Sequence, residues 1–395
     1  MSRGRRDDRG RVRELLLAAV SLERSDAHVA TLVENVDPDT LIRLARRHRV
    51  ASLLHDRLRG IGDHVSSPLT AQLRLEYLGA RASQLHAYRT IAALREAFDI
   101  PFLILKGPAL AVAWYEDPSL RMYVDVDVLV RRSDFRKALD ALTNAGFTHL
   151  LPSWDGLFAL GMAEVPLDHQ ACTVDLHWHL IARAQPRREI HLGERALFER
   201  ARPIKLGSVE VNTLDCEDTL LHLCVNCGLD GARRLQQLVD VDRVTRSGRI
   251  DWSAFTDRGC EARAHALCAA VLQRCHDLLG TPLPPGLLER LAPFPGWLQA
   301  NALINRRGRS DRRLTNGVTS GLLLASGRAK PITTTRSLMR AVREASRDRV
   351  RRLVPRRGGG LSGKPSDEDA RSRERYLAWV EDDAARHRRV EATES

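Results

Sequence analysis

The chain has 395 residues, of which 43% are hydrophobic and 28% are charged, so it can bury a core large enough for two or three lobes. Its formal net charge of +12 favours encounter with any polyanion and therefore does not separate nucleotides from nucleic acids. No apolar run approaches the ~20 residues of a membrane-spanning helix, and the polar start is unlike a secretory signal, so cytoplasm is the expected location.

The first hundred residues have mainly helical patterns. Residues 1–12 form a charged arm that we expect to be mobile, and residues 13–99 form an N-terminal helical lobe. Asp37-Pro38 is a typical N-cap followed by a first-turn proline, and Ser67-Pro68 has the composition that begins a long helix.

A short buried strand at residues 101–105 runs directly into Lys106-Gly107, and a helix is expected from Pro108. A strand, a glycine turn and a helix N-terminus together offer backbone N–H groups to a phosphate. Gly107 allows the chain to approach a ligand closely, and Lys106 adds a point charge. An ordinary strand-to-helix turn has the same pattern, so these two residues alone do not establish a nucleotide site.

The run Val124–Val130 carries two carboxylates in an otherwise apolar strand. Alternation places Asp125 and Asp127 on one face and the valines between them on the other. Neighbouring like charges need a cation, and Mg²⁺ is favoured because it binds carboxylates together with substrate phosphates, with Mn²⁺ as the alternative. Arg121, four residues upstream, could reach a triphosphate or pair with Asp125. A strand at the sheet edge with both carboxylates facing water is the competing interpretation.

A second alternating strand, within Cys172–Leu180, adds a third carboxylate, Asp175. If it lies beside the first acidic strand, Asp175 completes a cluster that can hold two cations roughly 3.5–4 Å apart during phosphoryl displacement. His177 and His179 share its face and could form a zinc site, because imidazole suits Zn²⁺ better than Mg²⁺. We favour His177 as a residue that contacts substrate or orients a metal ligand, and His179 as a polar residue at the strand end.

The later parts of the chain show no internal repeat. Residues 100–214 are expected to form the α/β core, including a hairpin-like region over 147–175 and a strand pair over 202–213. Residues 215–330 return to a helical pattern and form a C-terminal helical lobe. Cys224 and Cys227 have the Cys-x-x-Cys spacing of some metal and redox sites. The seven cysteines as a set show no spacing typical of a disulfide framework, so buried thiols on a helix are the better prediction.

Residues 331–395 are expected to form a basic helical tail with a glycine-rich linker. Nine arginines lie between Arg336 and Arg357. They could form an amphipathic helix for nucleic acid or an acidic membrane surface, or a solvated helix packed on the body. Aromatic residues are nearly absent from this segment, so binding of nucleic acid is a lesser alternative.

The combined motifs resemble the nucleotidyltransferase-like proteins of the polymerase-β superfamily. More narrowly, they resemble a poorly characterised branch in which Lys-Gly replaces the usual Gly-Ser. The resemblance covers roughly residues 38 to 250 and implies an α+β fold, with a small mixed β-sheet core flanked by N-terminal and C-terminal helical lobes. The residues that carry it are Leu105-Lys106-Gly107, Tyr115, Asp117-Pro118, Arg121, the two acidic strands and Leu238-Val239-Asp240.

By this resemblance, Asp125 and Asp127 correspond to the metal-binding pair, and Gly107 to the nucleotide-loop glycine. Asp175 corresponds to the third catalytic carboxylate, which could also act as the general base. Val124 stands where the branch often has a glycine, and the serine that ordinarily helps to hold a phosphate is absent.

The implied activity is an EC 2.7.7-type nucleotidyl transfer that depends on a divalent metal. A nucleoside monophosphate moves from an NTP, with ATP favoured, to an unidentified acceptor, and pyrophosphate leaves. Lys106 or Arg121 would offset charge on the pyrophosphate, since catalysis here is mostly positioning and charge neutralisation.

Two other functions stay open from the sequence. Glycosyltransferases that use nucleotide sugars also hold a divalent ion with an Asp-x-Asp pair, although they need a larger nucleotide-binding α/β region before it than this chain offers. A relative without catalysis could bind a nucleotide or RNA through the same residues. We favour nucleotidyl transfer because all three carboxylates are present.

Overall fold

The computed structural model describes residues 3–34, 36–62, 65–150, 153–170, 172–232, 234–299, 301 and 367–394. Its contacts divide these residues into two compact units. The sheet unit contains residues 85–109 and 124–214 together with the C-terminal helix. The helical unit contains the residues up to 84, residues 110–123 and the described residues from 215 to 301.

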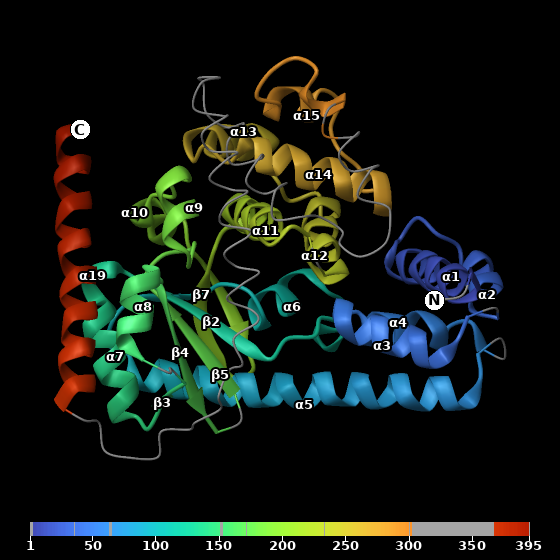
Figure 1. The fold of residues 1–395 in the computed structure, drawn as a ribbon, viewed down its shortest axis with the longest axis horizontal. Coiled ribbons are helices and arrows are strands. Elements are labelled where there is room, and N and C mark those ends of the chain that lie inside the picture. Colours follow the sequence, from blue (N-terminus) through green and yellow to red (C-terminus); the bar gives the residue numbers. More distant parts are fainter. Residues whose placement is uncertain are drawn as a thin grey trace. The chain divides into compact units, whose positions relative to one another are not determined.

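The sheet unit is built on a seven-stranded mixed sheet with the order β3-β4-β5-β2-β1-β7-β6 (Figure 1). β2 pairs in parallel with β5 and β1 with β7, whereas the other neighbours are antiparallel. This sheet, together with a large helical content, confirms the α+β fold. The strands are β1 (Phe102–Ile104), β2 (Asp125–Val130), β3 (Thr148–His149), β4 (Glu164–His169), β5 (Cys172–His177), β6 (Arg202–Leu206) and β7 (Val209–Thr213).

Alternation along β2 and β5 explains why these strands lie in the middle of the sheet. Val126, Val128, Val174 and Leu176 are completely buried, as the apolar face of each acidic strand predicts. Burying such a side chain contributes about 1.5–3 kcal/mol. The charged residues of the same strands must therefore lie on the opposite face, where the fold has to find partners for them.

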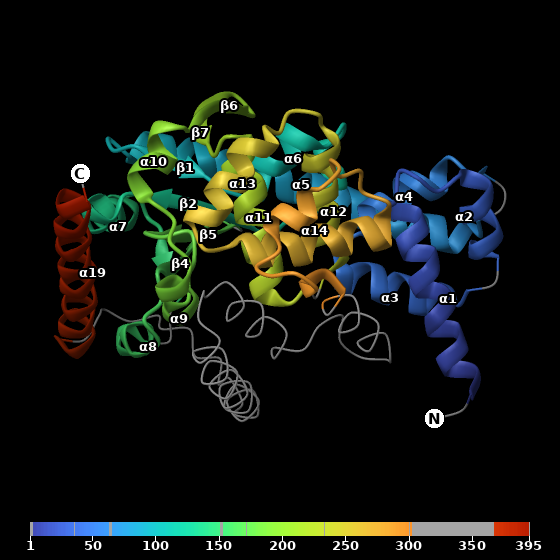
Figure 2. The ribbon, with the colours of Figure 1, turned by 90° about the horizontal axis from the view of Figure 1, so that it is seen from above.

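Helices α7 (Phe135–Asn144), α8 (Trp154–Leu160), α9 (Ala184–Glu189) and α10 (Glu194–Glu199) belong to the sheet unit. The C-terminal helix α19 (Asp367–Glu394) runs alongside α7 and α8 in both views (Figures 1 and 2).

An aromatic contact anchors α19 to the sheet unit. The hydroxyl of Tyr376 accepts a hydrogen bond from Trp178 Nε1 at 3.0 Å and donates one to the carbonyl oxygen of Met162 at 2.9 Å. The side chains of Tyr376 and Trp178 are both completely buried. This contact ties the end of β5 to a helix almost two hundred residues away in sequence.

The helical unit begins with four helices, and α5 and α6 each contribute residues to both units. Asp37 caps α3 by accepting a hydrogen bond from Thr40 N at 2.9 Å, with Pro38 in the first turn, as predicted. Cys224 and Cys227 are buried on α11, as predicted. The helices are α1 (Arg3–Val20), α2 (Asp26–Val33), α3 (Pro38–His48), α4 (Ala51–Arg59), α5 (Ser67–Ala97), α6 (Pro108–Trp114), α11 (Cys216–Asp230), α12 (Leu235–Arg246), α13 (Trp252–Glu261), α14 (His265–Leu279) and α15 (Leu287–Leu291).

The region expected to be hairpin-like, residues 147–175, contains a helix as well as a hairpin. β4 and β5 form the hairpin, and α8 lies between β3 and β4. Local signals explain the helix, because Ser153 caps its N-terminus and Gly161 ends it with a left-handed conformation at φ 57°. The prediction of a hairpin over the whole segment is therefore incomplete, because it misses α8.

None of the described helices combines the length and the apolar character needed to cross a bilayer. The arginines between Arg336 and Arg357, and the glycine-rich linker that follows them, lie outside the described residues.

Replacing Tyr376 with phenylalanine should lower the free energy of unfolding by about 1–3 kcal/mol, because the buried Trp178 Nε1 and Met162 carbonyl lose their partner. Urea unfolding followed by tryptophan fluorescence measures the change. As a control, Arg375→Ala removes an ion pair with Asp155 in which both side chains are more than half exposed, and should change stability by less than about 0.5 kcal/mol. Equal effects of the two substitutions would contradict the anchoring role of Tyr376.

Candidate metal centre

Parallel pairing of β2 and β5 brings two predicted carboxylates together. Asp127 and Asp175 are direct partners across the two strands, and Asp125 lies opposite Thr173. Because the pairing is in register, the side chains of Asp127 and Asp175 leave the sheet on the same face.

His177 joins these carboxylates. One ligand atom each from Asp127, Asp175 and His177 lies within 4.8 Å of the others. Two carboxylate oxygens and an imidazole nitrogen form a donor set that could hold a divalent metal ion. The sequence predicted Asp125 as a metal ligand together with Asp127 and Asp175. In the observed group, His177 is the third member and Asp125 is not included. The charge of Asp125 still acts on Asp175, so the two carboxylates are near each other.

The turn after β1 delivers a cation to this group. Lys106 Nζ lies 2.9 Å from Asp127 Oδ1, and Leu105 N donates a hydrogen bond to the backbone oxygen of Asp127 at 3.0 Å. Gly107 follows with a φ of 46°, a left-handed conformation that glycine adopts without steric cost, and α6 begins at Pro108. The predicted strand, glycine turn and helix are therefore next to the acidic pair.

His177 lies between two carboxylates. Its Nε2 is 3.3 Å from Asp127 Oδ1, and its Nδ1 is 3.6 Å from Glu164 Oε2. Glu164 is the partner of His177 in the antiparallel pairing of β4 with β5. Sequence reasoning missed Glu164, although its alternation with Val165 and Leu167 placed it on a polar strand face.

Burial and charge shift the titration of this group. Burial by itself would raise the pKa of Asp127, but Lys106 and His177 hold this pKa far below its usual range. Burial, followed by the negative charge of Asp127, raises the pKa of Asp175 to about 7. Burial would lower the pKa of His177, but its hydrogen bond with Asp127 and the charge of Glu164 raise it overall. Lys106 and His177 therefore compensate the charge of Asp127, whereas for Asp175 the favourable charge of His177 is outweighed by burial and by Asp127.

An apolar cluster borders the carboxylates on the same face. Leu129 lies two residues beyond Asp127 in β2 and belongs to a buried cluster with Leu103 and Leu105. Low polarity on this side strengthens each charge interaction in the group. The cluster also includes Leu180, Leu197 and Leu214.

Two of the predicted residues have other partners. His179 Nδ1 accepts a hydrogen bond from Ile181 N at 2.9 Å, just after the end of β5, consistent with a strand-end role. Arg121 belongs to the helical unit, where its Nε lies 2.8 Å from Asp240 Oδ1 and a second nitrogen lies 2.9 Å from Oδ2. Tyr115 donates to the same carboxylate at 2.7 Å, so three residues of the resemblance form one buried polar network.

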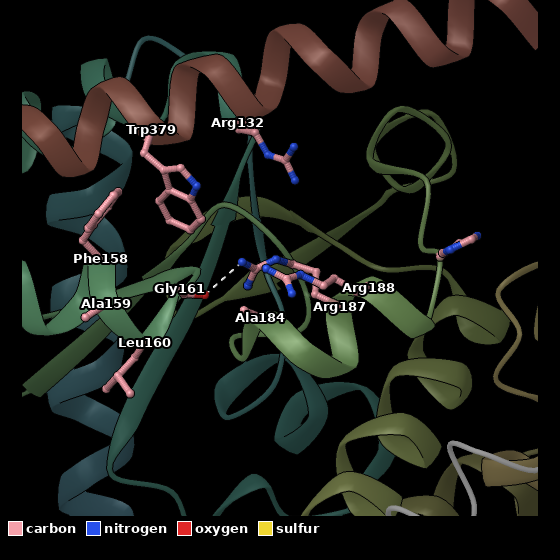
Figure 3. A pocket seen from close by; sticks show the side chains of 10 residues that line it. Arg132, Phe158, Ala159, Leu160, Gly161, Ala184, Arg187, Arg188 and Trp379 are labelled. Atoms are coloured by element: carbon pink, nitrogen blue, oxygen red, sulfur yellow. Dashed lines mark hydrogen bonds between the residues drawn. The ribbon is translucent and has the colours of Figure 1, made fainter. Parts of the chain in front are cut away.

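A separate cavity of about 590 Å³ lies in the sheet unit, beside α8, α9 and α19. Figure 3 shows Arg132, Arg187 and Arg188 on one side of it and Phe158 and Trp379 on the other. The lining of this cavity contains no member of the acidic group.

Carboxylates from two parallel strands, beside a strand–glycine–helix turn on a mixed sheet, define a candidate catalytic metal centre of an α+β protein. The family model described as an uncharacterised nucleotidyltransferase matches residues 34–280, and the chain belongs to this family. The match includes β1, β2, β4 and β5, and it confirms the nucleotidyltransferase-like resemblance. Among curated proteins, no relative matches the sequence. Family membership and the Asp127–Asp175–His177 group together support nucleotidyl transfer as the general activity.

Opposite stability effects are expected from removing the two carboxylates of the metal-free protein. Asp127→Asn leaves Lys106 and His177 without their ionised partner and should cost about 3 kcal/mol. Asp175→Asn removes a partly buried charge that the negative charge of Asp127 disfavours, and it should add about 1–2 kcal/mol at pH 8. Thermal unfolding in EDTA provides the measurement.

The size of the Asp175 effect should depend on pH. Because the pKa in the folded protein is raised from 3.8 to about 7, wild-type stability is lost as pH rises between these values. The advantage of Asp175→Asn should therefore be largest at pH 8 and small near pH 4. If Asp127→Asn and Asp175→Asn changed the unfolding temperature in the same direction at pH 8, that result would contradict this charge arrangement.

Proposed function

We propose that this protein is a nucleotidyltransferase that uses a divalent cation, Mg²⁺ or Mn²⁺, to transfer a nucleoside monophosphate from an NTP to an acceptor. ATP is the proposed donor, and pyrophosphate is the leaving group. The observation that carries the proposal is the in-register pairing of Asp127 with Asp175 beside Lys106-Gly107, in a member of this family.

The donor atoms fit a divalent cation. Asp127, Asp175 and His177 provide three ligand atoms in one group, and two of them are oxygens of the kind that Mg²⁺ and Mn²⁺ bind. A cation bound there would neutralise charge on the triphosphate and activate the attacking oxygen. Asp125, at the start of β2, is the proposed additional ligand, because it shares a strand face with Asp127.

The chain's own residues suit the remaining roles. Asp175 is the proposed general base, because its carboxylate lies beside Asp127 and can accept the proton of the attacking group. Lys106 is held beside the group by its 2.9 Å pair with Asp127, and its ammonium is the proposed group that offsets charge on the leaving pyrophosphate. The buried Gly107 would let the triphosphate approach the backbone closely. The contact of Arg121 with nucleotide stays a prediction, since its observed partner is Asp240.

Family membership favours nucleotidyl transfer over the glycosyltransferase alternative, because the match spans both acidic strands. The non-catalytic alternative predicts the same nucleotide binding without turnover. Measurements of binding and of turnover together therefore separate the three functions.

The test begins with titration calorimetry of ATP and GTP into the protein with Mg²⁺, Mn²⁺ or EDTA. Pyrophosphate release is then measured with a sugar phosphate, a hydroxylated peptide or an RNA end as acceptor. We expect cation-dependent binding, and a loss of release of about 100-fold or more in Asp127→Asn and Asp175→Asn, because each removes charge placed for the transition state.

The matched control is Asp134→Asn, the same chemical change at a carboxylate after the end of β2 that belongs to no part of the group. It should leave binding and release unchanged. Turnover of a nucleotide sugar would contradict the proposal in favour of glycosyl transfer. Binding without release for any acceptor would favour a non-catalytic relative.

A further inference from the structure

We propose that Glu164 is a positioning residue that presents His177 as a nitrogen ligand of the metal centre, and that the site consequently selects a first-row transition-metal ion such as Mn²⁺ over Mg²⁺. This inference rests on the metal site of the proposed function. It goes beyond that function by naming the class of metal and a residue that acts through the ligand.

The first step is the position of the imidazole. Antiparallel pairing of β4 with β5 sets Glu164 opposite His177, and parallel pairing of β5 with β2 sets Asp127 on the other side. The imidazole is held between these carboxylates, with Nδ1 3.6 Å from Glu164 and Nε2 3.3 Å from Asp127. Its side chain is only 4% exposed, so it has little freedom to turn away.

The second step concerns the two ring nitrogens. A neutral imidazole carries its proton on one nitrogen and has a lone pair on the other. Without metal, Nε2 is hydrogen-bonded to the Asp127 carboxylate at 3.3 Å, so the ring carries a proton there. A cation that replaces this proton would leave the remaining proton on Nδ1, which the Glu164 carboxylate faces at 3.6 Å. Carboxylate–histidine–metal arrangements work in this way, and the carboxylate makes the nitrogen a better ligand. Glu164 is 28% exposed, whereas the histidine that it faces is 4% exposed.

The third step is the choice of metal. Mg²⁺ demands oxygen ligands in near-octahedral geometry and usually keeps several waters, whereas imidazole suits first-row transition metals such as Fe²⁺ and Zn²⁺. Mn²⁺ belongs to that row and also accepts carboxylate oxygens, so it is the transition metal that fits a mixed set of two carboxylates and one imidazole. If only carboxylate oxygens bound the metal, the relative affinities for Mn²⁺ and Mg²⁺ would not depend on the imidazole of His177. Because one of the three donor atoms within 4.8 Å of one another is an imidazole nitrogen of His177, this ligand favours Mn²⁺ and gives little to Mg²⁺. The structure therefore refines the expectation of Mg²⁺ that the carboxylates alone suggest.

The competing arrangement leaves His177 as a hydrogen-bonding partner of Asp127 and gives the metal only oxygen ligands. The two arrangements differ in one observable, which is whether a nitrogen binds the metal. Bound Mn²⁺ reports this directly, because its electron spin couples to a ligating ¹⁴N nucleus.

The experiment is electron spin echo envelope modulation of Mn²⁺ bound to the full chain without nucleotide, together with calorimetric Mn²⁺ and Mg²⁺ affinities. We expect ¹⁴N coupling from an imidazole in the wild type and its loss in His177→Gln. The ratio of Mn²⁺ to Mg²⁺ affinity should fall about tenfold in His177→Gln. Absence of coupling in the wild type, or an unchanged ratio in His177→Gln, would overturn nitrogen ligation.

Two substitutions test the positioning role of Glu164. Glu164→Leu removes the acceptor facing Nδ1 and should weaken Mn²⁺ binding about tenfold while changing Mg²⁺ binding much less. Glu164→Gln keeps an oxygen acceptor and should recover most of the lost Mn²⁺ affinity. The control, Glu210→Leu, makes the same change at an exposed position of β7 and should leave both affinities unchanged. Mn²⁺ binding in Glu164→Leu equal to wild type would overturn the role of Glu164.

The ratio of affinities is informative even if a variant is partly unfolded, because both metals report on the same folded fraction. The outcome is also separate from that of the proposed function. An oxygen-only Mn²⁺ signal with active pyrophosphate release would overturn this inference and leave nucleotidyl transfer standing. A nitrogen-coupled Mn²⁺ signal without pyrophosphate release with any acceptor would support this inference and count against nucleotidyl transfer.

Discussion

The parallel pairing of β2 with β5 is the constraint on which the site depends. It places Asp127 directly beside Asp175 on a face that is largely buried, and two like charges cannot remain there without compensation. Lys106 and His177 provide that compensation for Asp127, and Glu164 lies against the histidine. β1 ends in the turn that carries Lys106, β5 extends to His177, and β4 sets Glu164 against the histidine. Each neighbour of the acidic strands thus adds a charged or titratable group.

This arrangement joins stability to function. Asp127 has cationic partners in the metal-free protein, so it contributes to folding as well as to the site. Asp175 carries a raised pKa, so its ionised form is a cost that a bound cation would remove.

Strand alternation predicted much of the site, because it is a local property. The faces of β2 and β5 followed from their valines and aspartates, and the glycine turn followed from Lys106-Gly107. Register between strands is not local, and a slip by two residues would have set Asp125 against Asp175 instead. For the same reason the sequence could not show that Glu164 faces His177, or that Arg121 pairs with Asp240, 119 positions away.

The position of His177 also depends on a helix outside the family match. The next residue, Trp178, is completely buried and donates a hydrogen bond to Tyr376 of α19, whereas the family match ends at residue 280. A metal ligand must be held within a fraction of an ångström of its working geometry, and packing of its neighbours supplies that rigidity. Glu164 constrains the imidazole from one side, and the Trp178–Tyr376 contact constrains the backbone that carries it. In this chain, therefore, the C-terminal helix supports the strand end that carries His177, although none of its described residues belongs to the Asp127–Asp175–His177 group.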